Sequence, residues 1–271
     1  MRGRVLIIAG SDPSGGAGIQ ADVKTVTALG GFAMTAITAL TVQNTRGVSA
    51  VHPVSSDIVR DQAMACVEDI GVDAVKIGMI ADAKTARAVA ALLEGPLAGV
   101  PAVIDPVLTA TSGDALAGDG VAGAILDALA PRARLLTPNV PELAALTGRA
   151  VAGVDDAVDA ARALLRCAGA RAVLAKGGHF DAEEVVDALV ADEGDATLFS
   201  NRGLASTATH GTGCTLASAI ATGLAQGRAL DAACTRAIAY VREAIRTAPG
   251  YGAGRGPLNH AHTVRIDEEE G

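Results

Sequence analysis

The sequence contains no tryptophan and very few other aromatic residues, since aromatic side chains make up 2% of its 271 residues. Half of the residues are hydrophobic, so the core must be built from small and aliphatic side chains. This length can bury one large core or at most two smaller ones. We find no internal repeat, no low-complexity run and no linker rich in proline or serine. We therefore expect a single domain over residues 1–271.

Positive charge is also scarce, because the formal net charge is −8 and the pI is about 5.1. Nucleic acids and anionic membrane surfaces attract basic proteins, so we expect neither as a partner. No stretch approaches the roughly 20 apolar residues of a membrane span, and the first apolar run is too short for a signal peptide. We expect a cytoplasmic protein. The acidic residues 264–271 are expected to form a frayed, solvated tail.

Closely spaced cysteines are absent. The chain has four cysteines, and no two of them form a CxxC pair: Cys66, Cys167, Cys214 and Cys234. This spacing suggests neither a zinc ribbon nor a disulfide framework, so we expect reduced thiols.

Short apolar runs alternate with amphipathic ones along most of the chain. We expect strands at 4–10, 33–43, 73–78, 101–106, 133–139 and 171–178. We expect helices at 17–31, 57–70, 83–95, 120–131, 156–170, 213–227 and 230–248. A hairpin is predicted at 184–199, where two apolar runs flank a polar turn. Helices between buried strands predict an α/β fold with a mainly parallel sheet covered on both faces.

The loop "AGSDPSGGAGIQAD" follows the first predicted strand and is rich in glycine. It is not a Walker motif, because no Gly-Lys-Ser/Thr closes it. Gly16, Gly18 and Ala21 satisfy the dinucleotide pattern GxGxxA, but they lie several residues beyond the strand. The next strand also ends without an acidic residue for a ribose. A glycine-rich turn that caps a helix is the alternative interpretation.

Polar residues occur where the predicted parallel strands end, and these ends share one edge of the sheet. Gln43 offers an amide donor and acceptor that suit the edge of an aminopyrimidine ring. Met79 and Val107 could hold the faces of such a ring, and Asp22 could accept a hydroxyl or ring proton. Taken singly, Met79 could equally be a core residue and Asp22 a solvated helix carboxylate.

A second group of strand-end residues suits a nucleotide. Asp105 ends an apolar strand, while Asn139 and Glu142 lie one helical turn apart, and such oxygen ligands suit Mg²⁺. A capping box formed by Asn139 and Glu142 is the alternative. Lys176 ends another strand, where it could reach a phosphate or simply be a surface lysine.

The stretch "HGTGC" precedes an apolar helix. The amides of Gly211, Thr212, Gly213 and Cys214 can converge on one point, forming an anion hole for a transferring phosphoryl group. A thiol at a helix start is expected to have its pKa lowered below about 8.5, so Cys214 could act as a base. A small buried hydrophobic residue is the alternative.

Several motifs, in this order and at this spacing, resemble the hydroxymethylpyrimidine/phosphomethylpyrimidine kinases of thiamine biosynthesis, in the ribokinase-like superfamily. The resemblance runs from about residue 4 to about residue 260 and rests on "IAGSDPSGGAGIQADVKT", "ALTVQNTRGV", "KIGM", "DPV", "LLTPNVPE", "KGGH" and "HGTGCTLASAIA". It implies a kinase that uses ATP and Mg²⁺ to phosphorylate 4-amino-5-hydroxymethyl-2-methylpyrimidine and then its monophosphate. It also implies a Rossmann-like α/β/α sandwich with a small β flap, and a homodimer.

The resemblance assigns roles residue by residue. It implies that the pyrimidine is bound by Gln43, with Gly10, Asp22, Met79 and Val107 around it. From the residue chemistry above, we expect the nucleotide to be bound by Lys176, Asp105, Asn139 and His210, and the metal by Asn139, Glu142 and Asp105. Cys214 stands where sugar kinases carry a catalytic aspartate, which argues against a sugar substrate.

One departure concerns the C-terminal "GAGRGPLNH", where Ala253 and Arg255 replace histidines that family members often carry. Two alternatives to the pyrimidine kinase stay open. One is a pyridoxal or pyridoxine kinase of the same superfamily, because its substrate is also a flat heteroaromatic alcohol. The other is a non-catalytic sensor that binds the pyrimidine.

Overall fold

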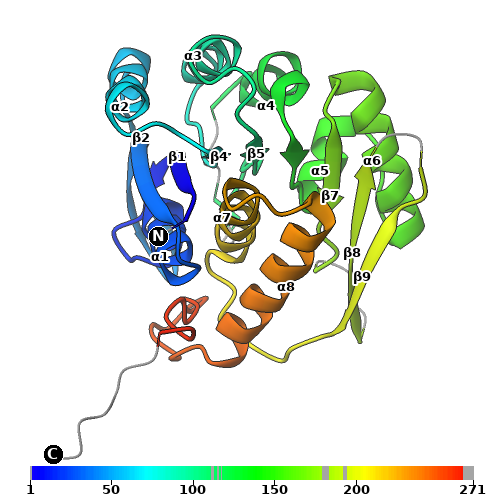
Figure 1. Ribbon diagram of the computed structural model, residues 1–271. Helices are drawn as coiled ribbons and strands as arrows, with labels where there is room; N and C mark the ends of the chain where they lie inside the picture. The colour runs from blue at the N-terminus through cyan, green and yellow to red at the C-terminus, as the bar shows by residue number, and fades with distance from the viewer. Residues whose placement is uncertain are drawn as a thin grey trace, which may run out of the picture.

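The computed structural model describes residues 2–110, 113–114, 116, 118–178, 183–191 and 194–264. Within these residues the strands form one nine-stranded sheet with the order β3-β2-β1-β4-β5-β6-β7-β8-β9 (Figure 1). The strands are β1 (Arg4–Ser11), β2 (Phe32–Asn44), β3 (Gly47–Pro53), β4 (Ala74–Ile77), β5 (Ala102–Ile104), β6 (Leu135–Leu136), β7 (Ala172–Ala175), β8 (Glu184–Ala191) and β9 (Thr197–Arg202).

The six central strands are all parallel, as the alternation of strands and helices predicts, and they are β2, β1, β4, β5, β6 and β7 in sheet order. Antiparallel strands extend the sheet at both edges. The predicted hairpin is confirmed as β8 and β9, and it pairs with β7. The sequence analysis did not predict β3, which pairs with β2 at the opposite edge. The additional β structure therefore continues the main sheet and does not form a separate small flap.

Eight α-helices occur in the described residues: α1 (Gly18–Ala28), α2 (Ser56–Asp69), α3 (Ala83–Glu94), α4 (Val121–Ala124), α5 (Val140–Thr147), α6 (Val154–Ala168), α7 (Thr212–Ala225) and α8 (Leu230–Arg246). The single helix expected at 120–131 is divided. Its second part is a π-helical turn at Ile125–Leu129 and a 3-10 turn at Ala130–Arg132, which contains Pro131.

The side chains of β1 show how the sheet is covered. Leu6 and Ile8 belong to a core cluster that includes residues of α2, α3 and α6, whereas Val5 and Ile7 belong to a second cluster that includes residues of α1, α7 and α8. Successive residues of a strand point to opposite faces, so both faces of this strand are buried by helices. Figure 1 shows α7 and α8 running together over one face of the sheet. The α/β/α sandwich expected from the sequence is confirmed.

All four cysteines are free, as expected. No helix within the described ranges is long and apolar enough to cross a membrane. The expected acidic tail lies almost entirely outside the described residues, which end at Val264.

Candidate active site

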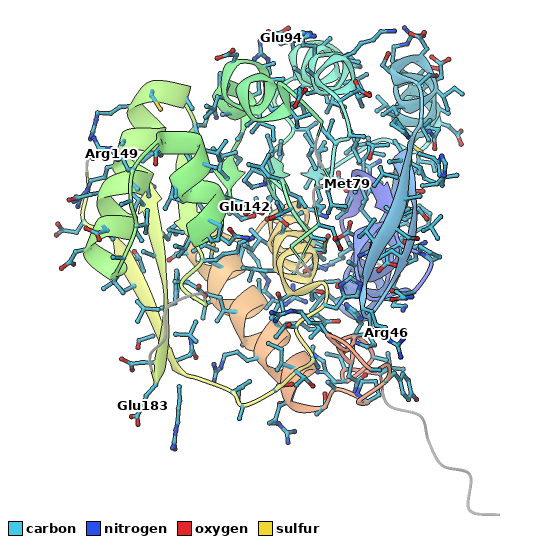
Figure 2. All side chains as sticks on the ribbon, turned by 180° about the vertical axis from the view of Figure 1, so that it is seen from behind. Arg46, Met79, Glu94, Glu142, Arg149 and Glu183 are labelled. Atoms are coloured by element: carbon cyan, nitrogen blue, oxygen red, sulfur yellow. The ribbon has the colours of Figure 1, made fainter. Side chains whose placement is uncertain are left out.

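A cavity of about 690 Å³ lies at the edge of the sheet where the parallel strands end, beside the start of α7. Figure 2 labels two residues that line it, Met79 just after β4 and Glu142 in the first turn of α5. With one exception, every site residue predicted from the sequence lines this cavity: Gly10, Gln43, Met79, Asp105, Val107, Asn139, Glu142, Lys176, His210, Gly211, Thr212, Gly213 and Cys214.

The exception is Asp22, which does not line the cavity. Its carboxylate is fully buried, and the Lys76 ammonium lies 2.7 Å from one of its oxygens and 2.9 Å from the other. The Ser218 hydroxyl also donates to it, over 2.7 Å. Asp22 is therefore a buried partner of Lys76 beneath the cavity, and the expected contact with a substrate ring is not available to it.

Gln43 and Met79 belong to one end of the cavity, together with Gly10 and Val107. The Thr41 hydroxyl lies 3.1 Å from Gln43 Oε1 and donates to it, which orients the amide. A Cβ atom at Gly10 would lie 2.9 Å from the Met79 sulfur. Glycine at this strand end therefore lets the Met79 side chain lie against the backbone.

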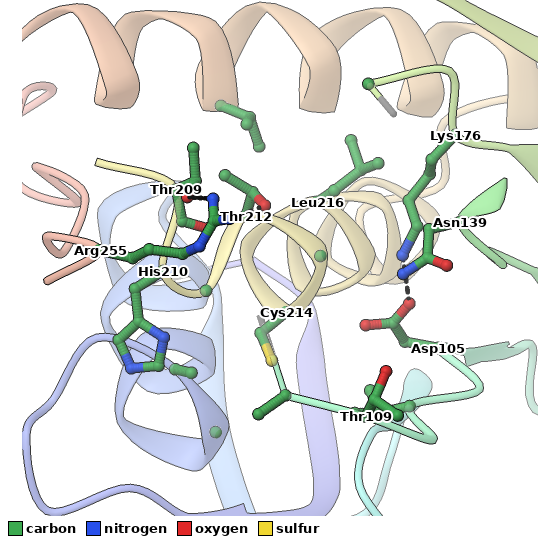
Figure 3. Close-up of a pocket in the computed structure, with 18 of the residues that line it drawn as sticks. Asp105, Thr109, Asn139, Lys176, Thr209, His210, Thr212, Cys214, Leu216 and Arg255 are labelled. Atoms are coloured by element: carbon green, nitrogen blue, oxygen red, sulfur yellow. Dashed lines mark hydrogen bonds and ion pairs between the residues drawn. The ribbon is translucent and has the colours of Figure 1, made fainter. Parts of the chain in front are cut away.

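A second part of the cavity holds opposite charges from two strand ends and from the first turn of α5. Lys176 Nζ lies 2.7 Å from Asp105 Oδ1 (Figure 3) and 3.8 Å from Glu142 Oε2. Burial raises the pKa of Glu142 to about 7, although Lys176 lowers it. Burial alone lowers the pKa of Lys176, but the carboxylates of Asp105 and Glu142 raise it above its ordinary value. Lys176 is therefore a largely buried, charged group held between two acidic side chains.

Asn139 and Glu142 form the capping box that the sequence offered as an alternative. Asn139 Oδ1 accepts from the backbone N–H of Glu142 over 2.9 Å, and Glu142 Oε2 accepts from the Asn139 N–H over 2.8 Å. Both side chains nevertheless face the cavity. The capping box and a metal site are compatible, because a carboxylate and an amide oxygen can each accept more than one interaction.

The described residues contain no group of three or more His, Cys, Asp or Glu side chains that could hold a metal alone. Mg²⁺ does not require one, since it keeps several waters and uses one or two carboxylates with substrate phosphates. A Cβ at Gly213 would lie 3.1 Å from both Asp105 Oδ2 and Lys176 Nζ. Glycine thus keeps the space beside these charges open, and the oxygen donors there fit Mg²⁺.

The turn before α7 presents backbone amides to the cavity. Gly211 is the N-cap with φ of 83°, and no side chain caps the helix. A Cβ at Gly211 would lie 1.9 Å from the carbonyl oxygen of Gly16, so only glycine permits this close approach of the two loops. Within the described residues, the Thr212 N–H makes only a long hydrogen bond of 3.4 Å to the Thr209 carbonyl oxygen, and the next two N–H groups of this 14-residue helix are left for an anion.

Cys214 lines the cavity in the first turn of α7 (Figure 3), but the expected low pKa is wrong. Burial raises the pKa of its thiol to about 11, and the charge of Lys76 only partly opposes this effect. The Asp22 and Asp105 carboxylates raise the pKa further. Desolvation raises the pKa of the thiol more than the helix N-terminus lowers it, so Cys214 is a neutral thiol at pH 7.

Asp12 is a site residue that the sequence analysis left unassigned, although it ends the first strand. His210 Nε2 lies 2.8 Å from Asp12 Oδ2, and both side chains are buried. Asp12 also accepts from the backbone N–H groups of Ser14 and Ala17. The His210–Asp12 contact fastens the glycine-rich loop to the turn before α7.

The sequence analysis also missed an apolar end of the cavity, formed mainly by β8, the 203–206 loop, α7 and α8. Its residues include Val185, Leu204, Leu216, Ile238, Val241 and Ile245. On a helix, such residues follow the same periodicity as core residues, so periodicity alone does not distinguish them. Asp187 lies here too, where its carboxylate accepts from the backbone N–H of Gly177 over 2.8 Å.

A family model described as phosphomethylpyrimidine kinase matches residues 12–259. The hydroxymethylpyrimidine/phosphomethylpyrimidine kinase of Rhizobium meliloti is 48% identical over 262 residues, which cover 95% of this chain and 96% of that protein. The thiamine biosynthesis bifunctional protein ThiED of Geobacter sulfurreducens is 49% identical over 259 residues, covering 96% of this chain. The match spans only 52% of the Geobacter protein.

Among solved structures, an ADP complex of Bacillus subtilis pyridoxal kinase superposes with a TM-score of 0.87 at 32% sequence identity. The match covers 96% of this chain and 98% of that one. The ribokinase-like fold expected from the sequence is therefore confirmed.

Proposed function

The chain belongs to the phosphomethylpyrimidine kinase family, and we propose that it transfers the γ-phosphoryl group of ATP first to 4-amino-5-hydroxymethyl-2-methylpyrimidine and then to the monophosphate. It is a phosphotransferase. The observation that carries the assignment is one continuous cavity, in which the uncapped start of α7 shares its walls with Gln43 and with Lys176. A ring, a transferring phosphoryl group and a nucleotide can be bound there together.

The pyrimidine is held at the Gln43 end. The Gln43 amide can pair with a ring nitrogen and the amino group, because it carries both a donor and an acceptor. Met79 and Val107 supply apolar contact to the ring, and Gly10 leaves the room that Met79 needs. The buried Asp22 acts on this site only through the elements that it joins.

The amides at the start of α7 hold the phosphoryl group during transfer. Gly211, Thr212, Gly213 and Cys214 contribute these amides, and they stabilise the charge on the phosphoryl oxygens. His210 and Asp12 fix the turn in position. The Cys214 thiol is neutral at pH 7, so a role as base requires that it lose its proton to solvent or to another group before it accepts one from the substrate.

ATP phosphates lie near Lys176, whose ammonium can bind a phosphate oxygen. Asp105, Asn139 and Glu142 would hold Mg²⁺, which when bound neutralises phosphate charge and orients the phosphates. The apolar end of the cavity, including Leu216 and Ile238, suits an adenine base. These assignments follow from the position and chemistry of the side chains.

A homodimer and a cytoplasmic location are part of the same proposal, and no nucleic-acid partner is expected, given the net charge of −8. Leu40 and Val42 on β2 are 50% and 52% exposed, next to the edge strand β3. Such a surface suits contact with a second copy. Light scattering during size-exclusion chromatography measures the mass, and a monomer would contradict the dimer.

The alternative substrate class is pyridoxal or pyridoxine, which the likeness to a pyridoxal kinase structure favours. The decisive experiment incubates the protein with Mg·ATP and each heteroaromatic alcohol and measures ADP release. We expect turnover of the pyrimidine at the highest kcat/KM. A preference for pyridoxal would replace the assignment, and binding without turnover would support the sensor.

A further inference from the structure

Arg255 lines the cavity from the C-terminal loop, which follows α8. Its backbone N–H donates to the carbonyl oxygen of Thr45 over 2.8 Å, two residues beyond Gln43. A Cβ at Gly254 would lie 2.0 Å from the same Thr45 oxygen, so the loop lies directly against the end of β2. The backbone of Arg255 is thereby fixed close to the pyrimidine end of the cavity.

The side chain of Arg255 extends toward the turn before α7. Its Nη1 donates to Thr209 Oγ1 over 3.2 Å, and Figure 3 shows the guanidinium beside Thr209. Thr209 directly precedes His210 and the amides of the anion hole. Arg255 thus connects the loop that follows Gln43 with the turn that precedes the proposed site of phosphoryl transfer.

Arg255 differs in its pairing from Lys176 and His210, two other basic groups that line the cavity. Lys176 and His210 each lie within 3 Å of a carboxylate oxygen. Arg242 belongs to α8 and donates to the carbonyl oxygen of Arg202, at the end of β9. In the part of the chain that the structure describes, Arg255 has no carboxylate partner, and its guanidinium bonds only the Thr209 hydroxyl. Most of its donors therefore remain available to a ligand.

We propose that Arg255 binds the phosphate of the monophosphate substrate and thereby favours the second phosphorylation. The inference rests on the proposed function. A monophosphate ester attached to a ring at Gln43 must place its phosphate between that ring and the anion hole, which is where Arg255 lies. Guanidinium groups bind phosphate with two parallel hydrogen bonds, and an ester phosphate carries close to two negative charges at pH 7.

The two transfers make different demands on the site. In the second, an oxygen of the substrate phosphate forms a bond to the γ-phosphorus as the bond from that phosphorus to ADP breaks. ADP leaves with the electron pair, and the dianionic nucleophile needs no base. Two phosphate groups must approach each other, so a cation beside them reduces their repulsion. The first substrate is a neutral alcohol and gains little from Arg255.

The experiment compares the parent protein with Arg255→Met, Arg255→Lys and the control Arg46→Met. Arg46 is labelled in Figure 2, and a Cβ at Gly254 would lie 3.0 Å from its Cα, but it does not line the cavity. Kinetics are measured with the alcohol and with the monophosphate. Binding of each compound is measured by isothermal titration calorimetry without ATP.

We expect Arg255→Met to lower kcat/KM for the monophosphate about 10- to 100-fold, mostly by raising KM. This is the range expected when hydrogen bonds to a charged group are lost. Turnover of the alcohol should stay within about twofold, which also shows that the variant folds. The kcat/KM of Arg255→Lys for the monophosphate should lie between those of the parent and Arg255→Met, because lysine keeps the charge but lacks the planar guanidinium. Arg46→Met should match the parent on both substrates.

Equal loss on both substrates, or no loss on either, would overturn the proposal. If the parent turns over neither compound, the proposed function fails, and calorimetry then decides on Arg255 alone. Binding of the monophosphate that is weakened by Arg255→Met supports the inference in that case. Absence of monophosphate binding by the parent, or equal binding by parent and variant, contradicts it.

Discussion

The Lys76 ammonium lies 2.7 Å from Asp22 Oδ2, and neither side chain is exposed to solvent. Ser218 donates to the other oxygen of Asp22 and follows Cys214 by one turn on α7. The ion pair therefore connects α1, β4 and α7 directly beneath the anion hole. Removing one partner leaves a buried charge without its counter-charge, which is more costly than the pair itself.

We expect Lys76→Met or Asp22→Leu alone to lower the free energy of unfolding by about 3–5 kcal/mol. The double variant should lose much less free energy of unfolding than the two single variants together, because no unpaired charge remains. Denaturation in urea measures all four proteins of the cycle. Additive losses would show that the two side chains contribute independently.

Gln43→Ala should raise KM for the pyrimidine and leave KM for ATP nearly unchanged. An unpaired polar group in a buried site costs about 1–3 kcal/mol, or roughly 5- to 150-fold. The control is Val42→Ala, at a neighbouring position whose side chain is 52% exposed. An unchanged KM for the pyrimidine in Gln43→Ala would remove Gln43 from the substrate site.

Glu142→Gln should raise the Mg²⁺ concentration needed for half-maximal activity, because the metal loses an ionised ligand. Glutamine can still complete the capping box, so stability should change little. Asp82→Asn is the matched control, since Asp82 caps α3 outside the cavity. If only thermal stability falls and the metal dependence stays the same, Glu142 acts through the helix cap.

Cys214→Ser should bind both substrates but lower kcat for the alcohol about 10²- to 10⁴-fold if the thiolate is the base. Cys214→Asp should retain more activity than Cys214→Ser. Because the pKa of the thiol is about 11, the thiolate fraction rises with pH throughout the neutral range. The parent's kcat for the alcohol should therefore rise with pH toward that value, and the rise should be absent in Cys214→Ser.

Phosphorylation of the monophosphate provides an internal comparison for Cys214, because a phosphate oxygen has no proton to lose. We expect Cys214→Ser to impair this second transfer less than the first. If the Ser and Asp variants turn over the alcohol like the parent, with the same pH profile, Cys214 only fills space and the backbone amides make the site.

The buried side chain of His260 leads us to expect that the protein loses stability in acid. The His260 side chain is buried, and its Nε2 lies 3.0 Å from the Thr215 Oγ1 on α7. Burial lowers the pKa of His260 from 6.5 to about 4. The unfolded chain binds this proton more readily, so the group's contribution to stability is present above pH 6.5 and is lost as the pH falls toward 4. The loss amounts to about 3 kcal/mol.

The measurement is urea denaturation of the parent and His260→Asn between pH 7 and pH 4. The variant should start less stable and lose less stability across this range. His52→Asn provides the control for replacing a histidine by asparagine at an exposed position. Parallel curves for the parent and His260→Asn would contradict the prediction.

The sequence predicted the site well where residues end parallel strands, because topology alone brings those ends to one edge. Gln43, Asp105 and Lys176 were assigned correctly to a shared cavity on this basis. The partner of Asp22 was missed, since Lys76 lies inside an apolar strand and only the packing of α1 on the sheet brings them together. The pKa of Cys214 was wrong because it depends on burial, which no local motif reveals.

The close approach of Gly211 to the carbonyl oxygen of Gly16 also constrains when the site can exist during synthesis. One loop leaves the ribosome early and the other only after most of the chain has been made. A nascent chain can form much of the parallel sheet before α7 is available. It still lacks the helix start at which we propose that the phosphoryl group is held, so we expect an incomplete chain to transfer no phosphate from ATP.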